Sequence, residues 1–263
     1  MERSPLPPLR NNGHSYVYFS LAPNIYASYF DGAIIILDST SDKYLSLIED
    51  TAHYFKVILG FPFIKESNAT YAMVGSLEHD KDQYDYWISY FIEKRFIIHS
   101  STPGTAIASP LQEGGLVNYR WDLKKSWQPF SHASVLATAQ ALYTLAKVHR
   151  SIKRKGMQEI FDWISHSSLN KKLHEPSEQD LQKLSAAVDA ASLLYPKKTV
   201  CFPWAVTYAL LALKKGWNIQ LALGVQTNPF YAHAWAQTPS GKVINDDPLV
   251  AQVLSVIFKQ PSI

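Results

Sequence analysis

Three residues in the second half of the chain have the types and spacing needed for nucleophilic chemistry. Cys201 is the only cysteine, His233 follows it inside the run AHAW, and Asp246 lies thirteen residues beyond His233. A thiolate can attack a carbonyl carbon, an imidazole can take and return the proton, and a carboxylate can hold the imidazole in one orientation. This chemistry requires a fold that brings the three side chains together.

Cys201 is predicted to lie at the very start of a helix. The run TVCFPWAVTYALLALKKGW, residues 199–217, reads as a largely buried helix. Thr199 is a possible cap, Pro203 is tolerated only in the first turn, and Gly216 marks the end. The positive end of the helix dipole and its unpaired backbone N–H groups favour a thiolate at this position.

His233 and Asp246 are predicted to face each other across a hairpin. The runs IQLALGV, FYAHAWAQ and KVIND alternate as strands do, and TPSG, residues 238–241, separates the last two. If TPSG is a four-residue loop, Gln237 pairs with Lys242 and His233 falls directly opposite Asp246. The two Cβ atoms would then be about 5 Å apart, which lets the carboxylate hold an imidazole N–H.

Spacing alone leaves alternatives open. A register slip of one residue would place Asn245 or Asp247 opposite the histidine, and asparagine can also orient a catalytic imidazole. Cysteine at a helix start, histidine on a following strand and aspartate on the next is an arrangement used by cysteine peptidases and transglutaminase-like enzymes. The structural alternative is a buried cysteine, a core histidine and a solvated aspartate pair that closes the hairpin.

Helices precede these strands. Ser131 can cap a run through Val148, and a capping box at Ser177 begins a helix that ends before Pro196. A helical layer followed by an antiparallel sheet is an α+β arrangement. The final run LVAQVLSVIF fits a helix or a strand. The apolar positions of the other two amphipathic helices are Met157, Ile160, Phe161 and Ile164, and then Leu181, Leu184, Val188, Ala191 and Leu194.

The first half predicts a small β-sheet followed by helices. Two β-rich runs meet at Asp31-Gly32, a strong hairpin signal, and residues 43–47 supply a short third strand. Two later runs have apolar residues at helical spacing: Ile48, Ala52, Phe55 and Leu59, and then Tyr84, Trp87, Ile88, Phe91 and Ile92. The simplest interpretation of the second run is a helix whose apolar face lies in the core.

Composition and punctuation divide the chain into two domains. Residues 1–13 are a flexible, proline-rich lead-in, residues 14–98 form one domain, residues 99–130 form a linker, and residues 131–263 form the second domain. Residues 1–100 carry 8 basic and 12 acidic side chains, whereas residues 101–263 carry 17 and 10. The opposite signs of the two halves support the division.

Several classes of protein are excluded by composition. The net charge of +3 is too small to argue for nucleic acid, and no apolar run approaches the length of a membrane span. The amino end lacks a secretory signal, so we expect a soluble, cytoplasmic protein. A single cysteine excludes an intramolecular disulfide and Cys-based zinc clusters. There is no GxxxxGK phosphate loop, and neither a cofactor nor a metal is predicted.

The second half resembles a known family. Cys201 before an apolar helix, LGV at 223–225, and AHAW at 232–235 followed by a turn and VINDDP resemble the leader-peptidase domain of lasso peptide B proteins. These are transglutaminase-like cysteine peptidases, so the resemblance implies a papain/transglutaminase-like domain over roughly residues 130–263. It implies that Cys201 is the nucleophile, His233 the base and Asp246 the residue that orients it.

The first half resembles the module that some lasso B proteins carry at the amino end. Three short strands followed by helices look like the PqqD-like recognition element of ribosomally made, modified peptides (RiPPs), a small winged-helix-like β3α3 module. Such modules hold a leader peptide as an added strand beside the third strand and against the third helix. By this resemblance the leader-binding residues are Tyr44, Leu45, Ser46 and Leu47 on the strand and Tyr84, Trp87, Ile88 and Phe91 on the helix.

Together the resemblances imply a leader peptidase of lasso peptide maturation. The partners would be the leader of a precursor peptide and a separate lactam synthetase, an asparagine synthetase-like cyclase that would consume ATP. One rival hypothesis is a transglutaminase-like acyltransferase that passes the thioester to an amine. The other is a non-catalytic precursor-binding chaperone in which Cys201, His233 and Asp246 only pack.

Overall fold

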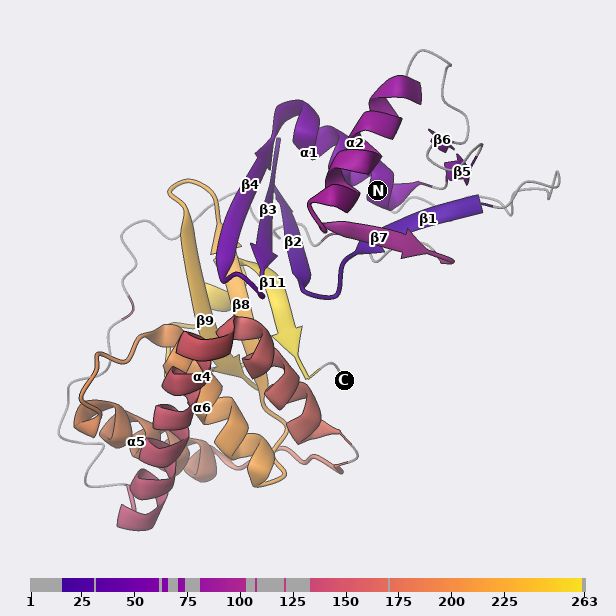
Figure 1. The fold of residues 1–263 in the computed structure, drawn as a ribbon. Coiled ribbons are helices and arrows are strands. Elements are labelled where there is room, and N and C mark those ends of the chain that lie inside the picture. Colours follow the sequence, from indigo (N-terminus) through magenta and orange to yellow (C-terminus); the bar gives the residue numbers. More distant parts are fainter. Residues whose placement is uncertain are drawn as a thin grey trace. The chain divides into compact units, whose positions relative to one another are not determined.

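The computed structural model describes residues 16–30, 32–61, 63–65, 71–73, 81–102, 107, 121, 133–169 and 171–261 (Figure 1). The chain forms two compact units. The first comprises Met1–Ile25 and Ile48–Ile107, and the second comprises Tyr26–Leu47 and Ala108–Ile263. The predicted lead-in, residues 1–13, lies outside the described residues, as does most of the predicted linker, residues 99–130.

The first unit contains a four-stranded sheet and two described helices. The sheet has the order β6-β5-β1-β7 and its described pairs are antiparallel. Aromatic side chains fill its core, and Phe55 meets Phe91 edge-on with ring centroids 4.9 Å apart. The elements are β1 (Tyr16–Leu21), α1 (Glu49–Gly60), β5 (Phe63–Lys65), β6 (Tyr71–Met73), α2 (Lys81–Glu93) and β7 (Ile97–Ser100).

Sequence patterns predicted the helices of this unit but not its sheet. Ala52, Phe55 and Leu59 are buried on α1 as expected, but Ile48 precedes the helix as its N-cap and is 55% exposed. Strands β1, β5, β6 and β7 were not predicted. β5, β6 and β7 have only three or four residues, too few alternations to be recognised. β1 has six residues, but it pairs with β5 and β7, far along the chain, and not with a neighbour across a turn.

The predicted hairpin and third strand form a separate sheet of order β2-β3-β4. Gly32 has φ +72° in the turn, where a left-handed conformation suits glycine. The hairpin and the strand are thereby confirmed. The strands are β2 (Ile25–Phe30), β3 (Ala33–Asp38) and β4 (Lys43–Ile48).

The position of this small sheet differs from the predicted division of the chain. Residues 14–98 were predicted to form one domain, but Tyr26–Leu47 packs as part of the second unit. Ile35 and Leu37 are buried in the same apolar cluster as the core of the second unit. Tyr26 meets Phe161 and Phe258 edge-on, with ring centroids 5.5 and 5.1 Å apart. A segment that the sequence places in residues 14–98 therefore completes the core of the second half.

The second unit begins with helix α4 (Val135–Ser168), which is broken at Gly156 with φ +74° and ψ −170°. The two helices predicted here are confirmed, with Ser134 as the first N-cap. Ser131, the predicted cap, lies outside the described residues. At the break, the Met157 N–H donates to Asp42 Oδ1 over 2.6 Å, so a residue of the β3–β4 turn caps the second half of α4.

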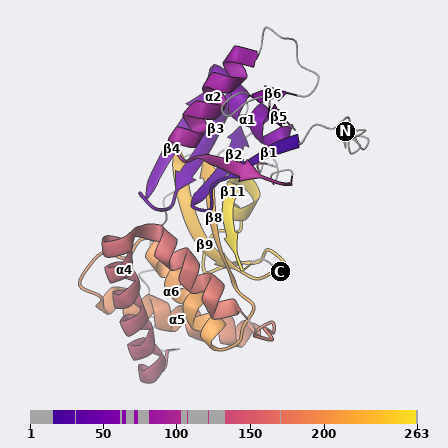
Figure 2. The same cartoon turned by 45° about the vertical axis from the view of Figure 1, so that its right-hand side comes forward.

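The helices α4, α5 and α6 lie against one another beside a four-stranded antiparallel sheet of order β10-β9-β8-β11 (Figures 1 and 2). The predicted α+β arrangement of the second half is confirmed. The last run of the chain holds both a short helix and a strand. The elements are α5 (Glu178–Leu194), α6 (Cys201–Lys214), β8 (Gln220–Gln226), β9 (Tyr231–Gln237), β10 (Val243–Ile244), α7 (Val250–Val253) and β11 (Ser255–Gln260).

Candidate active site

Cys201 is the first residue of α6, as predicted, and its thiol is free and partly exposed. Val200 is the N-cap, and its side chain makes no capping hydrogen bond. Thr199, the predicted cap, is buried, and its hydroxyl has no hydrogen-bond partner among the described residues. The first helical N–H groups therefore have no side-chain cap, which leaves them available to a negatively charged group beside the cysteine.

His233 lies in the middle of β9, opposite Gly224 of β8. The residue is only 2% exposed, because strands flank it and α6 packs on β9. Its ring and the Cys201 side chain are within hydrogen-bonding reach of each other. The apolar pattern of α6 and the alternation of β9 thus bring the nucleophile and the imidazole together.

Asp246 completes the group, because its Oδ2 accepts a hydrogen bond of 2.7 Å from His233 Nε2. Both side chains are almost wholly buried. Since Nε2 is engaged by the carboxylate, Nδ1 is the ring nitrogen left to exchange a proton with Cys201. A carboxylate, an imidazole and a thiol in this order form a relay in which the carboxylate fixes the imidazole tautomer.

The register that predicted this contact is wrong by one residue. Val243, not Lys242, pairs with Gln237. The Thr238 N–H donates to the Lys242 carbonyl, so the loop has three residues, 239–241, and Gly241 has φ +88°. This is the common loop in which a turn is followed by a left-handed residue. The observed pairing, if continued, would place Asp247 opposite His233.

Asp246 still reaches the histidine because the strand does not continue. β10 ends at Ile244, and Asn245 adopts φ +55°, a left-handed conformation that asparagine tolerates better than most residues. Asp247 is exposed, and its Oδ1 accepts a hydrogen bond from the Leu249 N–H at 2.9 Å. Neither Asn245 nor Asp247, the predicted alternatives, takes the place of Asp246.

The charges around His233 favour its protonated form. Burial alone lowers the pKa of the imidazole, but the hydrogen bonds to Asp246 and Cys201, and the negative charge of both groups, outweigh burial. The pKa of His233 is raised to about 9. The ring is therefore an imidazolium at neutral pH, a form that stabilises a neighbouring thiolate and can donate a proton.

Two tyrosines lie near the reacting groups, and sequence reasoning missed their proximity. Tyr231 Oη is 3.4 Å from His233 Nδ1, and the two rings stack with centroids 5.9 Å apart. Burial and the charge of Cys201 raise the pKa of both Tyr231 and Tyr44 to about 12, so both hydroxyls stay protonated. The available signal was Tyr231 at i−2 from His233, on the same face of the strand.

The residues predicted to bind a leader fall in both units. On β4, the last strand of its described sheet, Leu45 and Ser46 are exposed, Tyr44 is half-buried and Leu47 is buried. On α2, Trp87 is partly exposed. The other three residues predicted on α2 are buried in the core of the first unit, as expected for the apolar face of a helix. They are Tyr84, Ile88 and Phe91.

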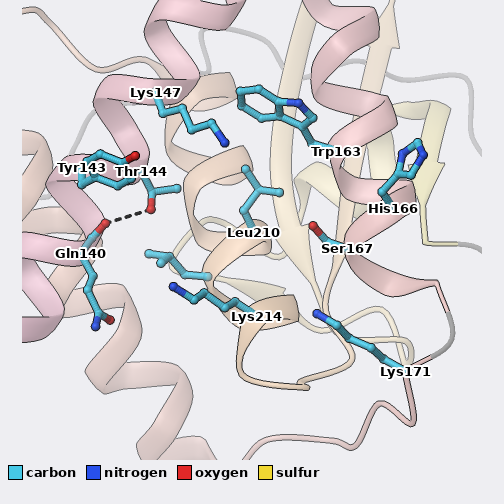
Figure 3. Close-up of a pocket in the computed structure, with 11 residues that line it drawn as sticks. Gln140, Tyr143, Thr144, Lys147, Trp163, His166, Ser167, Lys171, Leu210 and Lys214 are labelled. Atoms are coloured by element: carbon cyan, nitrogen blue, oxygen red, sulfur yellow. Dashed lines mark hydrogen bonds between the residues drawn. The ribbon is translucent and has the colours of Figure 1, made fainter.

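A cavity of about 450 Å³ lies elsewhere in the second unit, between α4 and the second half of α6 (Figure 3). Lys147, Lys171 and Lys214 line it, and the Lys147 ammonium lies 4.4 Å from the ring centroid of Trp163. Its lining residues on α6 begin at Leu210, roughly 14 Å along the helix axis from Cys201. The cavity is therefore not the site of the reacting groups.

The described residues contain no group of three or more His, Cys, Asp or Glu side chains that could hold a metal ion. Within the same part of the chain, no helix is both long and apolar enough to cross a membrane.

A comparison with known protein families finds a match that includes the three reacting residues. The sequence profile of the transglutaminase-like superfamily matches residues 144–259, a range that contains Cys201, His233 and Asp246. This part of the chain is similar to a transglutaminase-like domain. The predicted fold class is thereby confirmed at the level of an α+β, transglutaminase-like domain.

A curated relative extends the similarity beyond that domain. The chain is 29% identical to the microcin J25-processing protein McjB of Escherichia coli over 199 residues, which cover 74% of this chain and 90% of the relative. The resemblance to lasso peptide B proteins is confirmed. Because residues 130–263 are only about half of the chain, the similarity also reaches into the first half. No solved structure gives a significant match.

Proposed function

We propose that this protein is a cysteine peptidase that removes the leader from a lasso peptide precursor. The observation that carries the proposal is the buried Asp246–His233 hydrogen bond of 2.7 Å beside Cys201 at an uncapped helix start. The similarity to a microcin J25-processing protein supplies the substrate class. The transglutaminase-like domain is consistent with thiol chemistry at a carbonyl group.

The proposed reaction begins with the proton of the Cys201–His233 pair already on the His233 ring, as its raised pKa favours. The Cys201 sulfur then attacks the carbonyl carbon of the last leader residue as a thiolate. The backbone N–H of Cys201, at the start of α6, would donate to the oxyanion that forms. Asp246 holds Nε2 throughout and so keeps Nδ1 aimed at the sulfur.

The imidazolium then supplies the proton that the leaving group needs. His233 Nδ1 protonates the departing amine, the C–N bond breaks, and the leader stays on Cys201 as a thioester. Water attacks this thioester while His233 takes its proton and the C–S bond breaks, which releases the leader acid and restores the Cys201 thiolate beside the His233 imidazolium. The products are a free leader and a core peptide with a new α-amino group, the group that a lactam synthetase would need for ring closure.

Leader capture is proposed for the exposed part of β4. Tyr44, Leu45 and Ser46 lie on the last strand of the described β2-β3-β4 sheet, where a peptide could add as a further strand. The charge of Cys201 contributes to the raised pKa of Tyr44, so this strand begins close to the nucleophile. A leader held along β4 would therefore end near the reacting sulfur.

The test is incubation of the purified full chain with its cognate precursor, followed by peptide mass measurement. Wild type should give a matched pair of leader and core masses, Cys201→Ala should leave the precursor intact, and Asp247→Asn should behave as wild type. Equal processing by Cys201→Ala would contradict the peptidase. A cross-linked product formed with an added amine, without free leader, would favour the acyltransferase instead.

If wild type binds the precursor but leaves it intact, the incubation is repeated with the partner lactam synthetase. Cleavage that then depends on Cys201 keeps the peptidase and makes the cyclase a required partner. Binding that survives in Cys201→Ala, without cleavage under either condition, would favour the binding chaperone.

A further inference from the structure

A buried carboxylate outside the three reacting residues connects two of the elements that hold them. Asp189 lies on α5 within a stretch of nine consecutive buried residues, Leu184 to Ser192, and is only 4% exposed. Burying a carboxylate is costly unless hydrogen bonds compensate it. Its partners therefore show what the carboxylate does in this position.

One partner is on the helix that begins with the nucleophile. Trp204 Nε1 donates to Asp189 Oδ1 over 2.7 Å, and the indole is buried and stacked on Tyr208 with ring centroids 5.4 Å apart. Trp204 is three residues after Cys201, so both belong to the first turn of α6. The bond therefore fixes the end of the helix that presents the thiol.

The other partner is in the turn that presents the acid. Asn245 Nδ2 lies 3.1 Å from both Asp189 Oδ1 and Oδ2 and donates to the carboxylate. Asn245 directly precedes Asp246 and has the left-handed φ of +55° that ends β10. This conformation brings Asp246, rather than the next residue, to His233.

We propose that Asp189 is a positioning residue of the active site, which ties the Cys201 end of α6 to the Asn245 turn and so holds Asp246 against His233. The inference rests on the proposed function only for its activity measurement. Its geometric content, that Asp189 maintains the Asp246–His233 contact, can be measured without a substrate.

The first variant is Asp189→Asn, which keeps the shape and can still accept from Trp204. The new Nδ2, in the place of Oδ2, would face the Asn245 Nδ2 donor to donor, and the negative charge that held this amide would be gone, so the anchor of the turn should weaken. We expect kcat for precursor cleavage to fall about 10- to 100-fold with little change in KM, the size of effect expected for misplaced catalytic groups. The melting temperature is measured on the same samples.

The rescue variant exchanges the two groups. In Asp189→Asn combined with Asn245→Asp, the amide donates to the carboxylate from the opposite side, and aspartate also tolerates the left-handed conformation. We expect this double variant to recover most of the lost activity. Asn245→Gly is the milder second variant, because it keeps the backbone conformation and removes only the donated hydrogen bond.

The substrate-free measurement is the NMR titration of His233, assigned by comparison with His233→Gln. In wild type the pKa should be about 9. Loss of Asp246 from the ring should lower it toward the ordinary value of 6.5 in Asp189→Asn and restore it in the double variant. The titration applies even if the precursor is not the substrate, so it separates failure of this inference from failure of the proposed function.

The inference is overturned if the titration of His233 in Asp189→Asn and Asn245→Gly matches wild type. It is equally overturned if activity falls only in proportion to the unfolded fraction and the double variant gives no recovery. If Asp189→Asn does not fold, Asn245→Gly alone decides, and an unchanged pKa of His233 in that variant contradicts the proposal.

Discussion

The two halves of the relay are held by different kinds of structure. Cys201 and His233 sit on regular elements, a helix of 14 residues and a strand of seven residues that is paired along its whole length with β8. Asp246 follows a strand of only two residues and a left-handed Asn245. Backbone hydrogen bonds fix the first two positions, whereas side-chain hydrogen bonds and one backbone torsion fix the third.

This difference predicts which part of the site is most sensitive to substitution. The side chain of a residue on a long, paired strand keeps its orientation when a neighbouring residue is substituted, because many interstrand backbone hydrogen bonds hold the strand in place. A residue in a short turn depends on few contacts, so the acid position should be disturbed by changes that leave the helix and the strand intact. The predictions that follow test this contrast.

The largest effect is expected from the regular half. His233→Ala should lower kcat/KM for precursor cleavage by about 10⁴-fold, because the proton transfers to and from sulfur lose their carrier. The same variant should slow iodoacetamide alkylation at pH 7, which reports on Cys201 alone since the chain has one cysteine. Alkylation at the wild-type rate would show that His233 does not assist the thiol.

A smaller loss is expected from the irregular half. Asp246→Asn should lower kcat/KM by about 10²- to 10⁴-fold, since the amide cannot hold the imidazolium as a carboxylate does. Asp247→Asn is the matched control: its side chain is exposed and should change activity by less than about twofold. Equal losses in the two variants would mean that the turn, rather than the Asp246–His233 bond, matters.

The pH dependence should show a still smaller change. The pKa of His233 is raised to about 9, so the imidazolium that protonates the leaving amine is present below that pH. Cleavage should fall about tenfold per pH unit above 9, whereas the stability contributed by the charged ring should be lost earlier, as the pH rises from 6.5 to about 9. In Asp246→Asn this alkaline limb should move to lower pH, whereas Asp247→Asn should leave it unchanged.

The smallest effect tests the packing behind the strand. Gly224 pairs with His233, and a Cβ there would lie 2.8 Å from the Leu254 Cβ and the Trp235 ring. Gly224→Ala should lower the free energy of unfolding by about 1–3 kcal/mol, measured by denaturant titration. Gly60→Ala, where a Cβ meets nothing within 4 Å, is the control and should be near neutral.

Much of the second half could be predicted from local patterns. The start of α6 at Cys201 follows from Pro203 in its first turn, and its end follows from Gly216, which has φ +81°. The alternation of β8 and β9 is long enough to be read without a partner. The first half is harder to predict from the sequence, because its sheet joins four short strands from distant parts of the chain.

Two outcomes could not be read locally. The side chains of Ile35 and Leu37 suit a core, but the sequence does not say which core, and only packing assigns them to the second unit. The hairpin register was predicted one residue off, yet Asp246 is the residue at His233. The two deviations, a three-residue loop and a left-handed Asn245, offset each other.

By itself the sequence determined which residue types are available and on which elements they stand, since helix starts, strand alternation and the single cysteine are local properties. The tertiary structure decided which acid meets the histidine and which segment completes the core. Those outcomes depend on contacts between residues far apart in the chain, such as Asp189 with Asn245 and Asp42 with Met157. Long-range contacts of this kind leave no periodic signal in the sequence, because each needs only one side chain at the right place.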